Sequence, residues 1–530
     1  MTAETTDGPD QGHPRRWPAL AALCASLVVV TIDNTVLNTA LPALATALRA
    51  STADLQWITN AYTLVFAAML ITAGSLGARI GRRRALAGGL AVFAVGSAIA
   101  ATATSAGQLI GLRAVMGFGA AFVMPATLSV IVTLFSARER PKAIAIWSAT
   151  AGIGIVIGPV TGGVLLEHFS WSSVFWVNVP LVAAALTAIL VLVPALPGHR
   201  VGRIDTLGLV FSASGLAALV DTIVRGPEHG WLSGRSLGEG AAAVLLLAAF
   251  ALWELRAEHP MVDMRIFAVR TFTVAGAILG VTFFALSGLL FVLTQYLQLV
   301  HGYSPLKAGL GAVPFALAMA ATAGTSALVT ARVGTRAAVA GGLTTMSLGL
   351  AGLSLADVGT PYAVLSLGMA LVGAGMGLVM APASTATVGV LPRDKAPTAS
   401  SINSVVRELG GVLGIAVVGT VVSSSYRDRL THALPDAPAR ATEDLTAAHL
   451  TAAHLPPAPG ARLVAAADEA FASAMNHGTW ICVGITLLGA AAALRWLGRP
   501  GVGGTPPGEP VAAPATPSVE HAVGTPATAG

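Results

Sequence analysis

Charged side chains are scarce in this chain. Of its 530 residues only 10% are Asp, Glu, Lys or Arg, whereas 55% are hydrophobic; a soluble globular domain carries about 25% charged residues. The shortage excludes an ordinary soluble domain and predicts an all-α protein that crosses a lipid bilayer many times. The net charge of +5 does not indicate a nucleic-acid partner, because the basic residues stand between the apolar runs instead of forming a patch.

Cysteine and the usual signatures of enzymes are also scarce or missing. The two cysteines, Cys24 and Cys482, both lie in apolar runs, which argues against a disulfide framework and a zinc site. The histidines between residues 425 and 477 are irregularly spaced, so no metal site is expected there either. Because the chain has no P-loop, HExxH or GxSxG sequence, we expect neither ATP-driven transport nor a catalytic site, and no cofactor.

Long apolar runs take the place of charge. Windows of about 20 residues without Asp, Glu, Lys or Arg predict roughly fourteen membrane helices. The predicted helices cover residues 18–44, 56–76, 85–103, 107–135, 143–166, 173–195, 206–224, 238–255, 272–299, 308–330, 337–356, 361–388, 399–424 and 478–497. Lysine and arginine gather in alternate connections, and the positive-inside rule then places both termini in the cytoplasm.

A short internal repeat divides the predicted helices into two sets. The sequence Ala-Arg-Ile-Gly-Arg-Arg at 78–83 matches Ala-Arg-Val-Gly-Thr-Arg at 331–336, and each follows the second helix of a set of six. The expected organisation is a cytoplasmic N-terminus (1–17), a six-helix half (18–196), an inserted helix pair (197–262), a second six-helix half (263–500) with an outer loop (425–477), and a disordered cytoplasmic tail (501–530). Within the outer loop, an amphipathic helix over 461–474 is expected to lead into the last span.

One predicted helix carries a stripe of glycines. Gly154, Gly158 and Gly162 are four residues apart and therefore share one helix face, with Gly163 beside them. Pro159 removes a backbone donor and bends the helix. A smooth, bent membrane helix predicts a hinge that moves against a partner helix; the alternative is a helix that only packs the fold.

Three ionisable residues are expected at membrane depth, where a charge is costly and marks a functional site. Counted at 1.5 Å per residue, Asp33 lies about 12 Å and Arg113 about 9 Å below the outer surface, so the two are able to pair. Glu408 lies about 13 Å from the inner surface. We predict that all three take part in proton coupling. The alternatives are a static ion pair for Asp33 with Arg113 and, for Glu408, pairing with a buried cation.

A basic connection follows the second predicted helix. Glycine permits a tight turn there, and the arginines face the anionic inner leaflet and nearby helix C-termini. The residues of interest in this connection are Gly74, Arg79, Gly81, Arg82 and Arg83; the alternative is a generic positive-inside loop.

These segments together resemble the fourteen-helix drug:proton antiporter branch of the major facilitator superfamily. The resemblance covers residues 18–497 and rests most strongly on the Gly-x-x-x-Gly-Pro-x-x-Gly-Gly sequence, with further matches at 56–57, 178–180, 304–309, 373–377 and 407–411. It implies the major facilitator fold, with two six-helix bundles plus two extra helices. It also implies proton coupling through Asp33 and Arg113, a hinge in the kinked glycine helix, and a cytoplasmic gate in the basic connection that contains Gly74, Arg79, Gly81, Arg82 and Arg83.

Two departures from that family's pattern affect the same machinery. Ala78 stands where the family usually has an Asp that helps to lock the cytoplasmic gate, and Met116 replaces the usual Gln beside Arg113. The gate is therefore expected to be weaker or held by other contacts.

The expected function is export of small hydrophobic or cationic drugs and antibiotics across a bacterial cytoplasmic membrane, by a monomer that exchanges them for protons. The candidate substrate cavity is lined by amide, aromatic and methionine side chains suited to bulky apolar ligands, namely Asn38, Asn60, Tyr62, Phe284, Phe291, Gln295, Met380 and Asn403. Two alternatives stay open. One is an exporter dedicated to an endogenous metabolite or antibiotic. The other is a membrane receptor or enzyme, which would need a sensor domain or a catalytic cluster.

Overall fold

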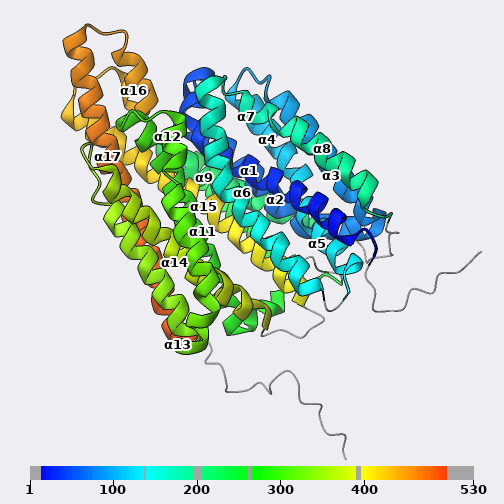
Figure 1. Ribbon diagram of the computed structural model, residues 1–530. Coiled ribbons are helices and arrows are strands. Elements are labelled where there is room, and N and C mark those ends of the chain that lie inside the picture. Colours follow the sequence, from blue (N-terminus) through cyan, green and yellow to red (C-terminus); the bar gives the residue numbers. More distant parts are fainter. Residues whose placement is uncertain are drawn as a thin grey trace, which may run out of the picture.

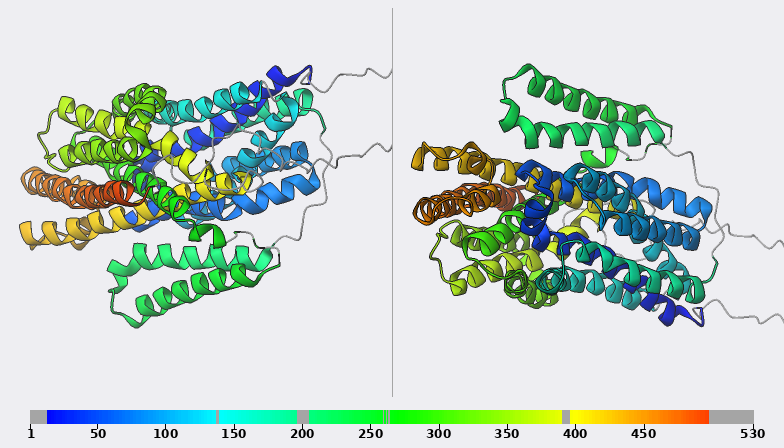
Figure 2. Two further views of the ribbon diagram at one scale, coloured as in Figure 1. Left: turned by 90° about the horizontal axis from the view of Figure 1, so that it is seen from below. Right: turned by 90° about the horizontal axis from the view of Figure 1, so that it is seen from above.

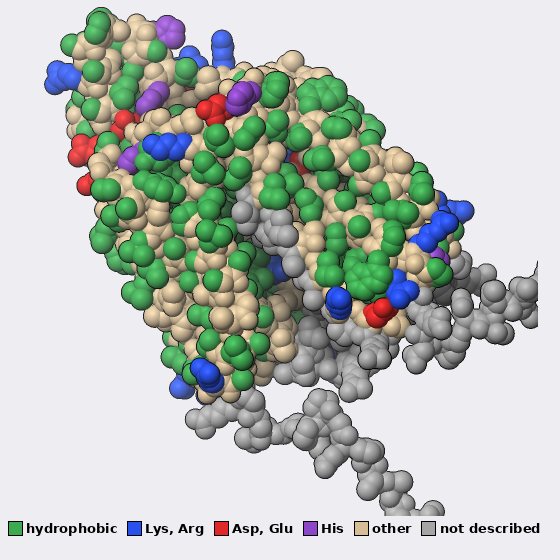
Figure 3. Space-filling view, in the orientation of Figure 1, with side chains coloured by type: hydrophobic (Ala, Val, Ile, Leu, Met, Phe, Trp, Pro, Cys, Tyr) green, Lys and Arg blue, Asp and Glu red, His purple; other side chains and the backbone are tan. Residues whose placement is uncertain are grey.

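The computed structural model describes residues 13–136, 139–195, 205–258, 260, 262, 264–389 and 396–497. Within these residues the chain forms helices and no strands, and twelve helical segments are long and apolar enough to cross a bilayer. Figure 3 shows hydrophobic side chains over the flank of the molecule, with Lys, Arg and His mostly towards its two ends. The predicted all-α membrane fold is therefore confirmed. The predicted disordered tail, 501–530, lies outside the described residues.

The helices form two bundles with a helix pair beside them (Figure 1, Figure 2). The first bundle consists of α1 (Arg16–Leu48), α2 (Thr52–Ile80), α3 (Arg82–Ala100), α4 (Ala106–Ala120), α5 (Val123–Leu134), α6 (Arg140–His168), α7 (Ser173–Trp176) and α8 (Asn178–Leu192). The second bundle consists of α11 (Arg270–Gln295), the π-helix η2 (Tyr296–Val300), α12 (Pro305–Leu310), α13 (Val313–Leu353), α14 (Tyr362–Gly389), α15 (Ala396–Ala433), η4 (Ala439–Thr442), α16 (Leu445–Ala452) and α17 (Pro457–Trp496). The pair is α9 (Thr206–His229) and α10 (Gly234–Arg256), followed by η1 (Met264–Ala268).

Several helices begin or end where the apolar pattern alone does not place them. The predicted helix 107–135 is two helices, α4 and α5, and the predicted helix 173–195 starts with the short α7. Helix α13 spans most of two predicted helices, with a non-helical residue, Gly334, between them. The segment 425–477, expected as an outer loop, is largely helical, because α15 and α17 continue through it and α16 lies between them. Its high alanine content favours helix. The helix expected at 461–474, leading into the last span, is confirmed by α17.

The repeated hexapeptides form the same turn in both bundles. Gly81 has a φ of 97° and Gly334 a φ of 80°, a backbone conformation that glycine adopts without strain. The last arginine of each repeat then reaches the end of its bundle's last helix. Arg83 donates to the Leu190 carbonyl of α8, and Arg336 donates to carbonyls at the end of α17. The two hexapeptides therefore repeat in structure as well as in sequence.

The two bundles are joined near the end of the molecule that carries α12 and α16, here called the α16 end (Figure 1). The side-chain amide of Gln56 in α2 lies 3.3 Å from the Ile415 carbonyl of α15. In the opposite direction, the amide of Gln298 in η2 donates to the Thr39 carbonyl of α1 at 2.8 Å. Each bundle thus contributes one glutamine to this contact between the bundles, here called the seam.

Helix α9 attaches the helix pair to both bundles. The Trp57 indole of α2 donates to Asp221 of α9 at 3.2 Å. The Thr420 hydroxyl of α15 donates to the Ile223 carbonyl of α9 at 3.0 Å. Apolar side chains of all three helices pack around these bonds. The pair shields the α2–α15 seam on one side, and α10 packs mainly on α9.

Candidate functional site

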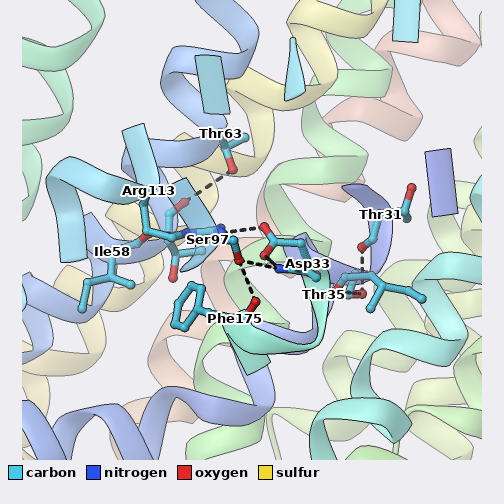
Figure 4. Close-up of polar contacts among 11 residues, drawn as sticks. Thr31, Asp33, Thr35, Ile58, Thr63, Ser97, Arg113 and Phe175 are labelled. Atoms are coloured by element: carbon cyan, nitrogen blue, oxygen red, sulfur yellow. Dashed lines mark hydrogen bonds and ion pairs between the residues drawn. The ribbon is translucent and has the colours of Figure 1, made fainter. Parts of the chain in front are cut away.

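A buried ion pair lies at the centre of the first bundle (Figure 4). The Arg113 guanidinium of α4 contacts Asp33 Oδ2 of α1 at 2.6 Å. The two side chains are 0% and 1% exposed. In such a low-dielectric place a lone charge is costly, so each residue stabilises the charge of the other. The depth count that predicted this pairing is borne out by the contact; the role of the pair in proton coupling stays a prediction.

The second carboxylate oxygen of Asp33 has a partner that the sequence reasoning missed. The side-chain amide of Asn178 donates to Asp33 Oδ1 at 2.7 Å and also lies 3.1 Å from the Ser97 hydroxyl. Ser97 donates in turn to the Phe175 carbonyl at 2.8 Å. Asn178 is the first residue of α8. Pro180 follows within the first turn, where a missing N–H costs nothing. A polar residue just before a proline in an apolar run was the available signal.

Arg113 is fixed by further contacts of α2. Its Nε donates to the Ile58 carbonyl at 3.3 Å, and its guanidinium lies over the Tyr62 ring, 4.3 Å from the centroid. Helix α4 approaches α2 this closely because Gly117 lies against the backbone of Tyr62. The arginine is therefore held on three sides, by a carboxylate, a carbonyl and an aromatic ring.

Glu408 stands in α15 of the second bundle, apart from this pair. Its side chain is half-buried, and its neighbour Arg407 lies over the Phe283 ring at 5.3 Å. The Tyr62 hydroxyl is within electrostatic range of both Asp33 and Glu408. The charges of both predicted proton carriers therefore act on Tyr62.

The glycine stripe packs on α1 of its own bundle. Gly154 and Gly158 lie against Thr31 and Thr35, and Gly162 lies against Val36. The stripe therefore packs α6 against the helix that carries Asp33, whereas we expected it to face a moving partner.

The other side of the same motif meets the second bundle. A Cβ on Gly163 would lie 2.5 Å from the Leu306 Cα of α12, and Gly309 lies directly against the Pro159 carbonyl. The contact between bundles thus depends on Gly163 and Pro159, not on the stripe itself. The predicted hinge role of all five residues stays a prediction.

The predicted gate residues occupy the turn between α2 and α3. Arg82 contacts the Thr133 hydroxyl of α5, and Gly74 lies beside Pro125 of the same helix. Arg79 is exposed. Together with the Arg83 bond to α8, these contacts join α2 and α3 to α5 and α8 at the end opposite α16. These contacts are able to stabilise the predicted gate without a side chain at position 78.

The predicted substrate-cavity residues do not surround one cavity. Asn38 lines a cavity of about 40 Å³ between the bundles, and Asn403 lines one of about 220 Å³ in the second bundle. Phe291 and Gln295 line a third, very small one at the α16 end. The bundles are closed together at that end, which explains why these side chains are packed instead of open. Their role in binding stays a prediction.

Buried polar atoms without a partner occur among the same predicted residues. In the described part of the chain, both side-chain atoms of Asn60, the Tyr62 hydroxyl and one oxygen of Asn403 are buried without a hydrogen bond. Buried polar groups are usually satisfied, and unsatisfied ones call for a bound molecule or another conformation.

Titratable groups gather at the α16 end. His449 of α16 and Asp468 of α17 form a contact of 2.8 Å. Burial raises the pKa of Asp444, which caps α16 by accepting the Ala447 N–H at 2.8 Å. Burial and the nearby Lys307 lower the pKa of His301. Within the described residues no group of three His, Cys, Asp or Glu side chains is arranged to hold a metal ion.

Known proteins of similar sequence and fold share this architecture. The Major Facilitator Superfamily model matches residues 23–415. The chain is 35% identical to the multidrug efflux pump LfrA of Mycolicibacterium smegmatis, over 92% of this chain and 97% of the relative. It is 32% identical to the tetracenomycin C resistance and export protein of Streptomyces glaucescens, over 81% of each chain.

A solved structure agrees in fold. A bacterial homolog of the human lysosomal transporter Spinster, in an inward-facing and unoccupied conformation, superposes with a TM-score of 0.64 at 17% identity, covering 91% of this chain and 98% of that chain. The two-bundle architecture, the glycine-rich helix α6 and the family match over residues 23–415 lead to one conclusion: the chain belongs to the major facilitator superfamily.

Proposed function

We propose that this protein is a proton-coupled exporter of small hydrophobic or cationic drugs, a drug:proton antiporter. The observation that carries the proposal is the buried pair of Asp33 and Arg113. A carboxylate in the interior of a membrane bundle is costly unless it has a role in moving charge. The export of drugs is supported by the names of the relatives, which are a multidrug efflux pump and an antibiotic resistance and export protein.

The coupling follows from the charge of the pair. Ionised Asp33 holds Arg113 through an ion pair and Asn178 through a hydrogen bond. Protonation of Asp33 removes the negative charge and weakens the hold on α4. Helix α1 also lies along the glycine stripe of α6, and α6 meets α12 of the other bundle at Gly163. A change at Asp33 therefore has a packed path to the contact between the bundles. Glu408 is the second proposed carrier.

We propose fourteen membrane helices for the whole chain. Twelve spans are found in the described residues. Helix α6 adds one more, and the break at Gly334 divides the long span 305–353 into two. The basic turns at Gly81 and Gly334 then face the cytoplasm, as do both termini, and the α16 end faces outward. The two halves are 18–196 and 263–500, with the pair 197–262 between them.

A second candidate is export of one endogenous metabolite or antibiotic. The tetracenomycin relative favours it, because that protein is named for resistance to and export of a single compound. Efflux assays with a panel of cationic dyes and aromatic antibiotics distinguish the two. Transport of several unrelated compounds supports the drug exporter, and transport of one supports the dedicated exporter.

The test of coupling is Asp33→Asn. The expected result is loss of efflux driven by a pH gradient in vesicles, with a normal amount of protein in the membrane. Asp221→Asn, an acid on α9 that is 29% exposed, is the matched control and should retain efflux. Efflux by Asp33→Asn that follows the gradient as in the unmodified protein would rule out the coupling role.

A further inference from the structure

We infer that Asn178, held by Ser97, is a positioning residue that sets the proton affinity of Asp33. The inference rests on the proposed function, in which Asp33 carries the transported proton. It adds a neutral residue that contacts the carboxylate and acts through it.

The geometry assigns one partner to each oxygen of Asp33. Arg113 contacts Oδ2 at 2.6 Å, and the Asn178 amide donates to Oδ1 at 2.7 Å. Hydrogen-bond donors stabilise an ionised carboxylate relative to its protonated form. Asn178 is 0% exposed, so water does not replace this bond when it is lost. The amide therefore contributes to the energy that protonation of Asp33 must overcome.

Ser97 fixes the direction of the amide. The Asn178 nitrogen also lies 3.1 Å from the Ser97 oxygen, and Ser97 uses its own proton for the Phe175 carbonyl. Both hydrogens of the amide nitrogen are thus directed at oxygens, one on α1 and one on α3. The arrangement suits the ionised form of Asp33, which only accepts hydrogen bonds.

The same amide is able to serve the protonated form. Among the described residues, the Asn178 side-chain oxygen is buried without a hydrogen-bond partner. When Asp33 takes a proton at Oδ1 it becomes a donor. A half-turn of the amide then presents the oxygen of Asn178 to that proton. An amide offers both a donor and an acceptor, so it can hold either state of Asp33, whereas a purely donating side chain would oppose protonation throughout the cycle.

The other helices around Asp33 carry few titratable groups. Arg113 of α4 and Tyr62 of α2 are the charged or titratable side chains recorded as interacting with it. By sequence, α5, α7 and α8 have none, and α6 has none between residues 143 and 166. Helix α11 has Arg270 at its first position, and α12 and α16 carry Lys307 and His449 at the α16 end. The neutral amide is thus the remaining close polar partner of the carboxylate.

The experiment measures protonation directly. Infrared titration of the purified full-length protein is used, and the Asp33 carboxyl band is identified by its absence in Asp33→Asn. In Asn178→Leu the protonated band should persist to a pH higher by about one to two units, since a hydrogen bond to a charged group is worth roughly 1.5–3 kcal/mol. The pH profile of efflux should move in the same direction. Ser97→Ala should give a smaller shift of the same sign.

Asn476→Leu is the matched control. It also removes a side-chain amide that donates a hydrogen bond, here to the Ala356 carbonyl at 3.1 Å, but it lies in the second bundle and should leave the band unchanged. An unshifted band in Asn178→Leu overturns the inference. If Asn178→Leu does not reach the membrane, an unshifted band in Ser97→Ala overturns the inference instead. If the unmodified protein moves substrate without a pH gradient, the proposed function fails while the infrared result still decides the role of Asn178.

Discussion

Position 158 has no room for a side chain. A Cβ on Gly158 would overlap the Thr35 hydroxyl, and that hydroxyl already donates to the Thr31 carbonyl at 3.0 Å. Overpacking of a tight contact costs about 1–3 kcal/mol. Because Asp33 lies between these two threonines in α1, any displacement of α1 by a larger residue at 158 also moves the carboxylate relative to Arg113.

We therefore predict that Gly158→Ala lowers efflux, normalised to the amount of protein in the membrane, by roughly tenfold. Adding Thr35→Ala should restore part of it, because the overlapping oxygen is then gone. Gly111→Ala is the control, since a Cβ there meets nothing within 4 Å. Normal efflux by Gly158→Ala, or an equal loss with and without Thr35, would contradict the account.

The two residues of the ion pair could be predicted from the sequence, whereas Asn178, the second partner of Asp33, could not. Asp33 and Arg113 stand out because charges are rare in apolar runs, and helix rise places them at one depth. Asn178 is neutral and starts a helix, so neither rule detects it. The helix against which the glycine stripe packs could not be predicted either, because periodicity shows which residues share a helix face but not which other helix covers that face.

At the scale of elements, the turn after α2 and the break in α13 have the same local structure and make equivalent contacts. Gly81 and Gly334 take positive φ angles, and the arginine two residues later donates to the last carbonyls of α8 or α17. Carbonyls at a helix C-terminus lack partners within the helix, and a cation there is favourable. The arginine thus closes each bundle by joining its third helix to its last.

We predict that Arg83→Ala and Arg336→Ala each loosen the last turn of the helix they contact, by about 1 kcal/mol. Hydrogen exchange should rise near Leu190 in the first variant and near Arg495 in the second, with little change in the other bundle. Arg84→Ala, an exposed neighbour, serves as the control. Faster exchange in both bundles from one substitution would show that the two arginines do not act locally.

The cap of α16 makes a prediction for pH. Burial raises the pKa of Asp444 from its ordinary value of 3.8, so the folded segment binds this proton more tightly than the unfolded one does. The contribution is therefore present at acid pH and is lost as pH rises through the raised pKa. Exchange of the α16 amides, corrected for intrinsic rates, should be slowest at the acid end. Asp444→Asn keeps the cap and should abolish the dependence; an unchanged dependence would contradict the assignment.

The boundaries of the helices were predicted less well than the all-helical, membrane-spanning character of the chain. Apolar runs gave the spans because the bilayer sets their length. They failed between residues 425 and 477, where α15 and α17 continue beyond the apolar windows. Helix there depends on alanine content and on packing of one extension against another, for example Tyr426 against Phe471, and neither contributes to a hydropathy window.

On the scale of the whole molecule, the seam at the α16 end is held by one amide from each bundle. Gln56 reaches α15 and Gln298 reaches α1. Gln298 lies in η2, and π-helical turns often occur at functional sites. Opening at this end requires both bonds to break, so each one biases the protein toward the closed arrangement.

We predict that Gln56→Leu and Gln298→Leu each raise the share of molecules open at the α16 end about threefold, for a bond worth about 0.6 kcal/mol in a membrane protein. Electron-spin distances between labels at Ala47→Cys and Asp428→Cys, with the native cysteines replaced, measure this share. Gln108→Leu is the control, because Gln108 bonds within the first bundle at Thr104. An unchanged distance distribution in both variants would show that the two glutamines do not stabilise the closed arrangement.

The attachment of α9 to both α2 and α15 has a practical consequence. When those two helices separate, the bonds of Asp221 and Ile223 to opposite bundles cannot both persist, so we expect the helix pair to shift relative to at least one bundle during transport. Val244 and Leu245 on α10 are 66% and 70% exposed and lie away from any proposed substrate path. A fluorescent dye at either position would serve as an optical reporter of single transport cycles, read from the lipid side without touching the cargo.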